Sequence, residues 1–221
     1  MSPALEVLLL WLAFAATHIG LSSQRVRLRL VGVVGERPFQ GLYSIVALAL
    51  FIPLVGVYFA NRHEGPWLWE LPESAALVWT LNLGMGVAFV LLVTGLVRPS
   101  PAALVPGGAE VRGVYRITRH PFVMATVIFG LLHLLPNGAA SDVAFFGGFV
   151  GFGLLGAWHQ DRRKLASGGE AYRSFHAATP FLPFTGRETL RGLRELSPLI
   201  TAAGVGLAVL VRYFHPAWFA D

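Results

Sequence analysis

Two histidines stand inside apolar stretches, where an ionisable side chain is costly and is therefore a candidate for function. His18 lies near the end of the first stretch, and His133 lies deep in the fourth, with no polar neighbour in the sequence. A neutral histidine hydrogen-bonded to a carbonyl across a helix bundle would explain either one alone. The chain contains no cysteine, so histidine and carboxylate are its strong metal ligands. Two such histidines point to a metal or haem site.

A basic cluster precedes the fourth apolar stretch. Arg116, Arg119 and His120 stand directly before Pro121. Two arginines and a histidine could hold an anionic group, such as a haem propionate or a phosphate, through charge-assisted hydrogen bonds. The alternative is that they only anchor the end of a membrane span. On one helix, His120 and His133 would lie about 20 Å apart along the axis and on roughly opposite faces, so they cannot bind one iron together.

The composition predicts an all-α, polytopic membrane helix bundle. Hydrophobic residues make up 55% of the chain and charged residues 13%, whereas a soluble domain carries about 25% charge. A span needs roughly 17–25 mostly apolar residues. The windows that meet or approach this length predict about six transmembrane helices, at 3–19, 41–60, 75–97, 122–136, 143–158 and 198–214. Little chain remains outside these windows, so we expect residues 1–221 to form a single integral membrane domain.

The basic residues predict the orientation of this bundle. Fifteen of the seventeen Lys and Arg residues fall in three alternate loops, 20–40, 98–121 and 159–197. The positive-inside rule places these loops in the cytoplasm and both termini on the other side. The net charge of +5 does not predict a nucleic-acid partner, because the basic residues are not gathered on one solvated face. We therefore expect membrane lipid around the chain and no nucleic acid bound to it.

Several short sequence motifs follow one another along the chain. They are His18-Ile19-Gly20-Leu21-Ser22, Gly35-Glu36-Arg37, Tyr43-Ser44, Asn61-Arg62-His63-Glu64-Gly65, Arg116-Ile117-Thr118-Arg119-His120-Pro121, His133, and Gly156-Ala157-Trp158-His159-Gln160-Asp161-Arg162-Arg163. In this order they resemble the bacterial NnrU family and its plant relative, zeta-carotene isomerase. The likeness covers about residues 14–184, most of the chain.

This resemblance implies a membrane protein that binds haem b. The plant isomerases carry haem held by histidines that match His18 and His133, so these two are the predicted iron ligands, with His120 as the fallback partner of His18. Arg116 and Arg119 are predicted to hold the cofactor's carboxylates at the cytoplasmic face.

The resemblance leaves two activities open. In the plant enzymes the haem assists cis-to-trans isomerisation of a central double bond in a linear carotene. NnrU proteins are instead associated with bacterial nitrite and nitric oxide reduction. The expected partner is therefore an apolar, lipid-like substrate such as a linear carotene, or a nitrogen-oxide reductase system, in the bacterial inner membrane.

One residue departs from this pattern, and the predicted depths of the two histidines conflict with it, because ligation of one iron by both requires equal depth. Gly130 stands where the plant motif has a cysteine three residues before the deep histidine, so a thiol cannot replace a histidine as ligand here. The predicted depths of the two histidines also differ. His18 lies within a few residues of the cytoplasmic face, whereas His133 lies about 18 Å from it at 1.5 Å per residue.

A second likeness involves the segments 113–121, 169–175 and 180–183. Their layout looks like that of isoprenylcysteine carboxyl methyltransferases and related phospholipid methyltransferases, which bind S-adenosylmethionine at the cytoplasmic ends of their helices. Those enzymes typically carry paired glutamates where this chain reads Asp161-Arg162-Arg163-Lys164. Methyl transfer is the alternative enzymatic function. A third alternative is a non-enzymatic assembly partner of a membrane reductase, in which the histidines only pack.

Overall fold

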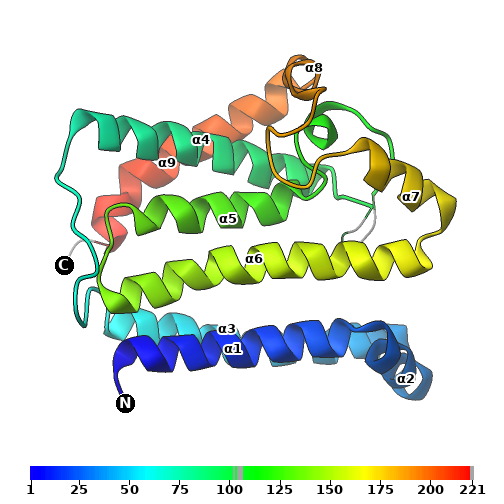
Figure 1. The fold of residues 1–221 in the computed structure, drawn as a ribbon, viewed down its shortest axis with the longest axis horizontal. Coiled ribbons are helices and arrows are strands. Elements are labelled where there is room, and N and C mark those ends of the chain that lie inside the picture. Colours follow the sequence, from blue (N-terminus) through cyan, green and yellow to red (C-terminus); the bar gives the residue numbers. More distant parts are fainter. Residues whose placement is uncertain (102, 104–106, 220–221) are drawn as a thin grey trace. The chain divides into compact units, whose positions relative to one another are not determined.

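A computed structural model describes residues 1–101, 103 and 107–219. In this part of the chain every named element is a helix, which confirms the predicted all-α fold (Figure 1). In chain order the elements are α1 (Pro3–Ser22), α2 (Gln24–Val34), α3 (Glu36–Ala60), α4 (Ala75–Val97), the short 3₁₀ helix η1 (Gly113–Arg116), α5 (Pro121–Leu134), α6 (Ala140–Ser167), α7 (Gly169–Ala178), α8 (Thr189–Arg194) and α9 (Pro198–Phe219).

The apolar helices agree with the predicted membrane bundle. Five described helices, α1, α3, α4, α6 and α9, are long and apolar enough to cross a membrane. Helix α5 is a mostly apolar helix of 14 residues, shorter than a span of about 17–25 residues. Each of the six predicted windows overlaps one of these helices.

Local sequence explains where several helices begin and end. Ser2 caps α1 by accepting a hydrogen bond from the backbone N–H of Leu5 at 3.4 Å, and Ser74 caps α4 through the N–H of Leu77 at 3.2 Å. Gly35 separates α2 from α3 with a φ of 87°, a backbone conformation that favours glycine. These cap and turn residues thus set where the helices begin and end.

The described chain forms two compact units, and each is described by itself. Unit 1 comprises Met1–Pro72 and His133–His159, and therefore contains α1, α2, α3 and the first part of α6. Unit 2 comprises Glu73–Leu132 and Gln160–Asp221, with α4, most of α5, η1, the end of α6, α7, α8 and α9. The single membrane domain expected from the sequence stays a prediction.

The core of unit 1 is built from aromatic rings. Trp11 is only 4% exposed, and its indole Nε1 donates a hydrogen bond to the carbonyl of Phe145 at 3.1 Å. The rings around it, with centroids 5.1–6.1 Å away, are those of Phe14, Phe51, Phe149 and Phe152. These five residues, including Trp11, are referred to as the aromatic cluster. They join α1, α3 and α6 within unit 1.

The spacing between α1 and α6 depends on one glycine. A Cβ atom at Gly148 would lie 2.0 Å from the indole Nε1 of Trp11, which is far inside van der Waals contact. The backbone of α6 can therefore approach Trp11 only because residue 148 has no side chain.

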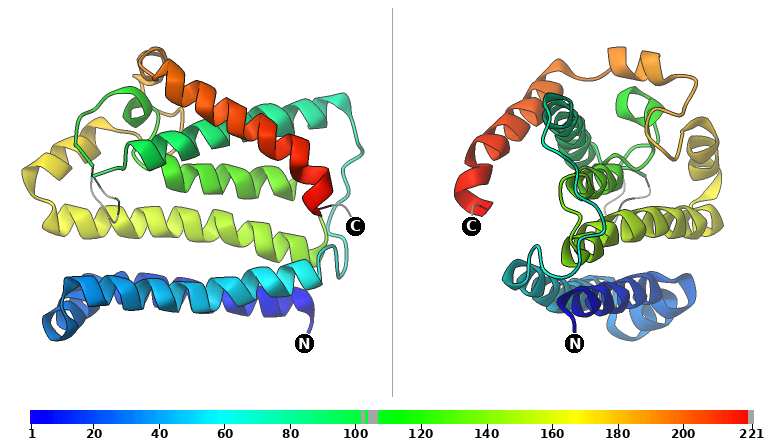
Figure 2. Two further views of the ribbon diagram at one scale, coloured as in Figure 1. Left: turned by 180° about the vertical axis from the view of Figure 1, so that it is seen from behind. Right: turned by 60° about the vertical axis from the view of Figure 1, so that its left-hand side comes forward.

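In unit 2, α4 and α9 lie side by side (Figure 2). A Cβ at Gly204 of α9 would lie 2.7 Å from the Cα of Val90 in α4, so this glycine allows the two backbones to come close. The chain after α7 is tied to the segment after η1 by two backbone hydrogen bonds. The N–H of Arg119 donates to the carbonyl of Pro180 at 2.9 Å, and the N–H of Phe184 donates to that of Ile117 at 3.2 Å.

Candidate functional site

His18 lies in the last part of α1, in a pocket of aromatic rings. Its imidazole is 5.2 Å from the ring of Phe14, 4.6 Å from Tyr43 and 5.3 Å from Phe152, centroid to centroid. The hydroxyl of Tyr43 donates a hydrogen bond to the carbonyl of His18 at 3.2 Å, which fixes α3 against this turn of α1. The surroundings of the imidazole are therefore apolar and well ordered by packing.

One nitrogen of His18 lacks a partner in these surroundings. The Nδ1 atom is buried and has no hydrogen-bond partner among the residues that the structure describes. Leaving a buried polar atom unsatisfied costs about 1–3 kcal/mol. A ligand bound at Nδ1 itself would remove this cost, and the open nitrogen makes His18 a candidate metal ligand in unit 1.

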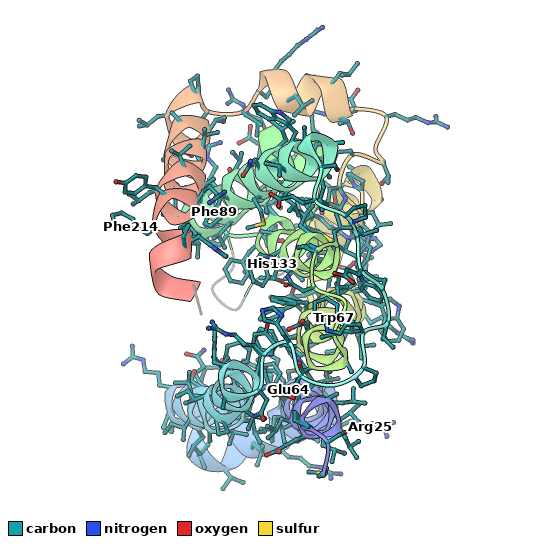
Figure 3. The ribbon with its side chains drawn as sticks, turned by 90° about the vertical axis from the view of Figure 1, so that its left-hand side faces the viewer. Arg25, Glu64, Trp67, Phe89, His133 and Phe214 are labelled. Carbon is teal, nitrogen blue, oxygen red and sulfur yellow. The ribbon has the colours of Figure 1, made fainter. Side chains whose placement is uncertain are left out.

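His133 lies in the last turn of α5, and its position belongs to unit 1 (Figure 3). Its imidazole stacks on Phe146 with ring centroids 4.8 Å apart and an interplanar angle of 25°. Its carbonyl accepts a hydrogen bond from the side-chain amide of Asn137 at 2.7 Å. Like His18, it is half-buried.

Both predicted iron ligands contact helix α6 within unit 1. His18 meets α6 at Phe152, and His133 meets it at Phe146. These contacts are six residues apart along the chain, which corresponds to about 9 Å along the helix axis. The two imidazoles thus approach the same helix at different levels, as the difference in depth predicted from the sequence implied.

The donor set of unit 1 suits a haem better than a bare metal ion. Among the described residues, no three His, Cys, Asp or Glu side chains are grouped so that they could hold a metal. A porphyrin supplies its own equatorial nitrogens, so it needs only one or two axial protein ligands. The candidate axial ligands in unit 1 are the imidazole of His18, with its unmatched buried nitrogen, and that of His133, which contacts the same helix α6.

The predicted basic cluster lies in unit 2, where Asp161 binds Arg119, a predicted partner of the cofactor's carboxylates, and His120, the fallback iron ligand. Arg119 donates from Nε to Asp161 at 2.8 Å, and from a terminal guanidinium nitrogen to the carbonyl of Thr179 at 2.8 Å. The Nε2 of His120 lies 2.8 Å from the other Asp161 oxygen. Both side chains are buried, so this cluster is a closed polar core beside α6.

Tyr172 completes the same cluster. Its hydroxyl donates to Asp161 at 2.7 Å, and burial, together with the hydrogen bond to Asp161, raises the pKa of Tyr172 above its ordinary value. The hydroxyl therefore keeps its proton and remains a donor. The sequence indicated no role for Asp161, although Asp161 organises the cluster.

Arg116 is paired in a second ionic cluster of unit 2. Its Nε donates to Glu195 at 2.9 Å, and one terminal nitrogen pairs with Glu188. Glu195 also accepts a hydrogen bond from the backbone N–H of Gly113 at 2.9 Å. This N–H, followed by the Arg116 guanidinium, lowers the pKa of Glu195 to about 2. The cluster ties η1 to the segment between α8 and α9.

Unit 1 contains a further buried carboxylate that the sequence did not single out. Asp142, with no exposed surface, accepts a hydrogen bond from the hydroxyl of Tyr58 at 3.0 Å. It also lies 2.9 Å from the Nδ1 of His63 and accepts from the backbone N–H of His63 at 3.2 Å.

Comparison with known proteins adds to this geometry. The family model described as "NnrU protein" matches residues 6–220. A protein of Arabidopsis thaliana named "15-cis-zeta-carotene isomerase, chloroplastic" is 32% identical over 235 residues, covering 97% of this chain and 60% of the relative. The Zea mays protein of the same name is 33% identical over 189 residues, covering 80% of this chain and 49% of the relative. The chain thus spans about half to three-fifths of the length of these curated relatives. No solved structure matches it.

Proposed function

The chain belongs to the NnrU family, and from this membership we propose that it is a haem b-binding membrane protein that acts as a carotene cis–trans isomerase. The observation that carries the proposal is its similarity, over 97% and 80% of its length, to two proteins named as zeta-carotene isomerases. An apolar substrate also suits a chain with five described helices long and apolar enough to cross a membrane. The bacterial inner membrane is the proposed location.

We propose His18 and His133 as the residues that would hold the haem iron. The buried, unmatched Nδ1 of His18 supports the assignment of His18. The assignment of His133 is supported because it contacts α6, the helix that His18 also contacts within unit 1. When bound, haem would supply a metal centre able to interact with a double bond and lower the barrier to rotation about it.

The chain's own contribution would be to exclude water and to align a linear molecule. The aromatic cluster around Trp11 gives unit 1 a rigid apolar interior, and flat aromatic faces pack well against a conjugated chain. A carotene has no polar group for a site to bind, so its orientation must come from the shape of such apolar walls.

Arg116 and Arg119 remain the proposed partners of the haem carboxylates, with one condition. Each guanidinium is paired with a carboxylate of the chain, Glu188 and Glu195 for Arg116 and Asp161 for Arg119. Binding a propionate would require these pairs to open or to share the arginine. Charge reversal at either arginine that left the haem content unchanged would remove this part of the proposal.

Absorption spectroscopy of the purified full chain tests the cofactor. We expect a Soret band after expression with ample haem precursor, and we expect it to weaken at least tenfold in His18→Ala and in His133→Ala. His215→Ala, at an exposed histidine of α9, is the matched control and should keep the band. A band that survives in both ligand variants would contradict the assignment, and loss in His18→Ala alone would leave one axial histidine.

An activity assay tests the reaction separately. The protein is placed in liposomes that contain 15-cis-zeta-carotene, and the cis and trans isomers are separated by chromatography over time in the dark. Conversion by the wild type and by His215→Ala, but not by His18→Ala, is the expected result. Haem-loaded protein without conversion would overturn the isomerase function while leaving the cofactor in place.

A further inference from the structure

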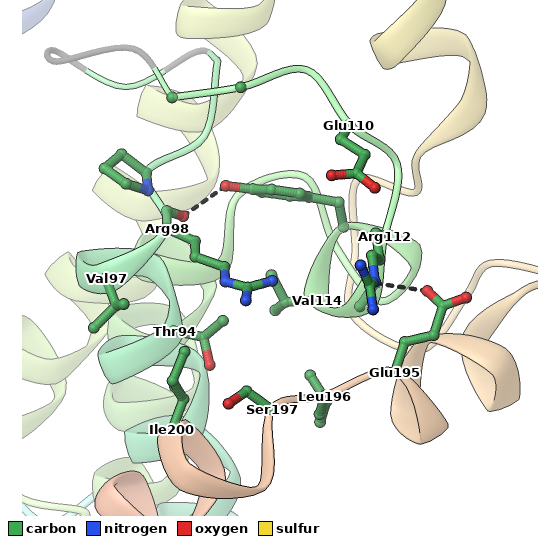
Figure 4. A pocket seen from close by; sticks show the side chains of 15 residues that line it. Thr94, Val97, Arg98, Glu110, Arg112, Val114, Glu195, Leu196, Ser197 and Ile200 are labelled. Carbon is green, nitrogen blue, oxygen red and sulfur yellow. Dashed lines mark hydrogen bonds between the residues drawn. The ribbon is translucent and has the colours of Figure 1, made fainter.

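Unit 2 contains a cavity that the haem proposal does not use. Its volume is about 420 Å³, within the size range of small-ligand pockets. It lies between the C-terminal end of α4, the segment leading into η1, and the start of α9 (Figure 4). The hydroxyl of Tyr115 donates to the carbonyl of Arg98 at 2.6 Å and closes one wall.

Two arginines line this cavity without a carboxylate partner. In the described part of the chain, neither Arg98 nor Arg112 has a side chain within ion-pair distance of an acidic group, although both line the space. Figure 4 shows the guanidinium of Arg98 reaching into the cavity, towards Val114. By contrast, Arg116 next to the cavity is held by two carboxylates. The cavity therefore has cationic groups available for a ligand.

The acidic residues of the cavity do not cancel this charge. Glu195 is already engaged by the N–H of Gly113 and by Arg116. Glu110 also lines the cavity and is exposed to solvent. One carboxylate thus stands against two arginines, all three of them exposed, which leaves a net positive site for an anion.

The other walls indicate that the anion is attached to an apolar group. Val97, Leu196 and Ile200 line the cavity beside the polar hydroxyl of Ser197. Val97 ends α4 and Ile200 lies in the first turn of α9, and both helices are long and apolar enough to cross a membrane. The cavity therefore lies at the ends of two candidate membrane spans and beside a basic loop, where lipid headgroups are expected.

We infer that this cavity binds a phosphate group through Arg98 and Arg112, with an anionic phospholipid as the source favoured by its apolar wall. Planar guanidinium groups form two parallel hydrogen bonds with phosphate oxygens. Basic pockets between membrane helices are known to recognise lipid headgroups in this way. The inference goes beyond the proposed function, since it involves neither histidine and does not depend on haem.

Binding of defined lipids to the full chain in neutral detergent tests the inference. The probes are dioleoylphosphatidylglycerol, dioleoylphosphatidylcholine and inorganic phosphate, and the readouts are lipid retention by native mass spectrometry and the Kd by titration. We expect phosphatidylglycerol to bind and each of Arg98→Gln and Arg112→Gln to raise its Kd about tenfold, as loss of a charge-assisted bond predicts. Arg187→Gln, at an exposed arginine of the same unit outside the cavity, is the control and should bind like the wild type.

The remaining outcomes separate the sources of the phosphate. If inorganic phosphate binds as tightly as phosphatidylglycerol, and the arginine variants weaken it equally, the site stands with a soluble phosphate as its ligand. If the double variant, shown to be folded by its helix content, binds phosphatidylglycerol as tightly as the wild type, the site is wrong. Equal binding of the neutral and anionic lipids, with no effect of either arginine, overturns it as well.

Discussion

The buried carboxylate of Asp142 pairs with the exposed imidazole of His63, whose Nδ1 lies 2.9 Å from one of its oxygens. His63 adopts a φ of 60°, a conformation that is costly for a residue other than glycine. The hydrogen bonds to Asp142 from both the backbone and the ring of His63 hold it there. The pair therefore shapes the turn that follows α3.

Replacement of Asp142 by asparagine should destabilise unit 1. The amide would place a donor among groups that already donate, so we expect a loss of about 2 kcal/mol or more and a fall of about 4–8 °C in the thermal midpoint. Tyr58→Phe removes one hydrogen bond and should cost about 1 kcal/mol. Thermal unfolding followed by circular dichroism in detergent measures both. A smaller effect for Asp142→Asn than for Tyr58→Phe would show that Asp142 does not organise the turn.

Asp161→Asn should have a larger effect, because it leaves Arg119 and His120 buried without their carboxylate. Breaking a buried ion pair by removing one partner costs about 3–5 kcal/mol. Glu170→Gln is the control, since its pair with Arg173 is exposed and should contribute about 1 kcal/mol at most. Denaturant titration of the two variants at one pH gives the comparison, and equal midpoints would refute the role given to Asp161.

Glu195 should make stability depend on pH in the acid range. Its pKa is lowered from an ordinary value of 4.5 to about 2, so the folded state binds its proton less readily than the unfolded state. The resulting stabilisation is complete above pH 4.5 and is lost as the pH falls towards 2. The stability difference between the wild type and Glu195→Gln should thus be the same at pH 7 and pH 5.5 and smaller at pH 3. A difference that grows on acidification would contradict this sign.

Two neighbouring glycines of α6 provide a test of the aromatic core. Gly148→Ala places a Cβ against the indole of Trp11, and overpacking of this kind costs about 1–3 kcal/mol. Gly147→Ala meets nothing within 4 Å and should leave stability unchanged or slightly higher. Because α1 carries His18, Gly148→Ala should also reduce the Soret absorbance of the haem-loaded protein. Equal unfolding midpoints for the two alanine variants would show that α1 does not need this close approach.

The helices could be predicted from the sequence more completely than their contacts. Apolar windows located every candidate span, because hydrophobicity is a property of each segment by itself. The window 143–158 was nevertheless too short, since α6 continues to Ser167 through charged residues that an apolar window excludes. Similarly, the basic loop 20–40 contains helix α2, which is amphipathic rather than apolar.

The site was predictable only in part. His18 and His133 could be singled out because a histidine in an apolar span is conspicuous in the sequence. Asp142 and Asp161 could not, because each stands near the end of an apolar stretch, where a charged residue is ordinary. Their roles depend on partners that are distant in the sequence, His63 for Asp142 and Arg119 for Asp161. Only the folded chain brings each aspartate to its partner.

Helix α2 has a consequence for the depth of His18. It begins after a single residue beyond α1 and has no buried side chain, while exposing both Arg29 and apolar residues such as Leu28. A helix with this pattern settles at the boundary between headgroups and acyl chains. Because only Ser23 separates the two helices, we expect the lipid surface to set the height of the end of α1, and with it that of the His18 imidazole, four residues before that end.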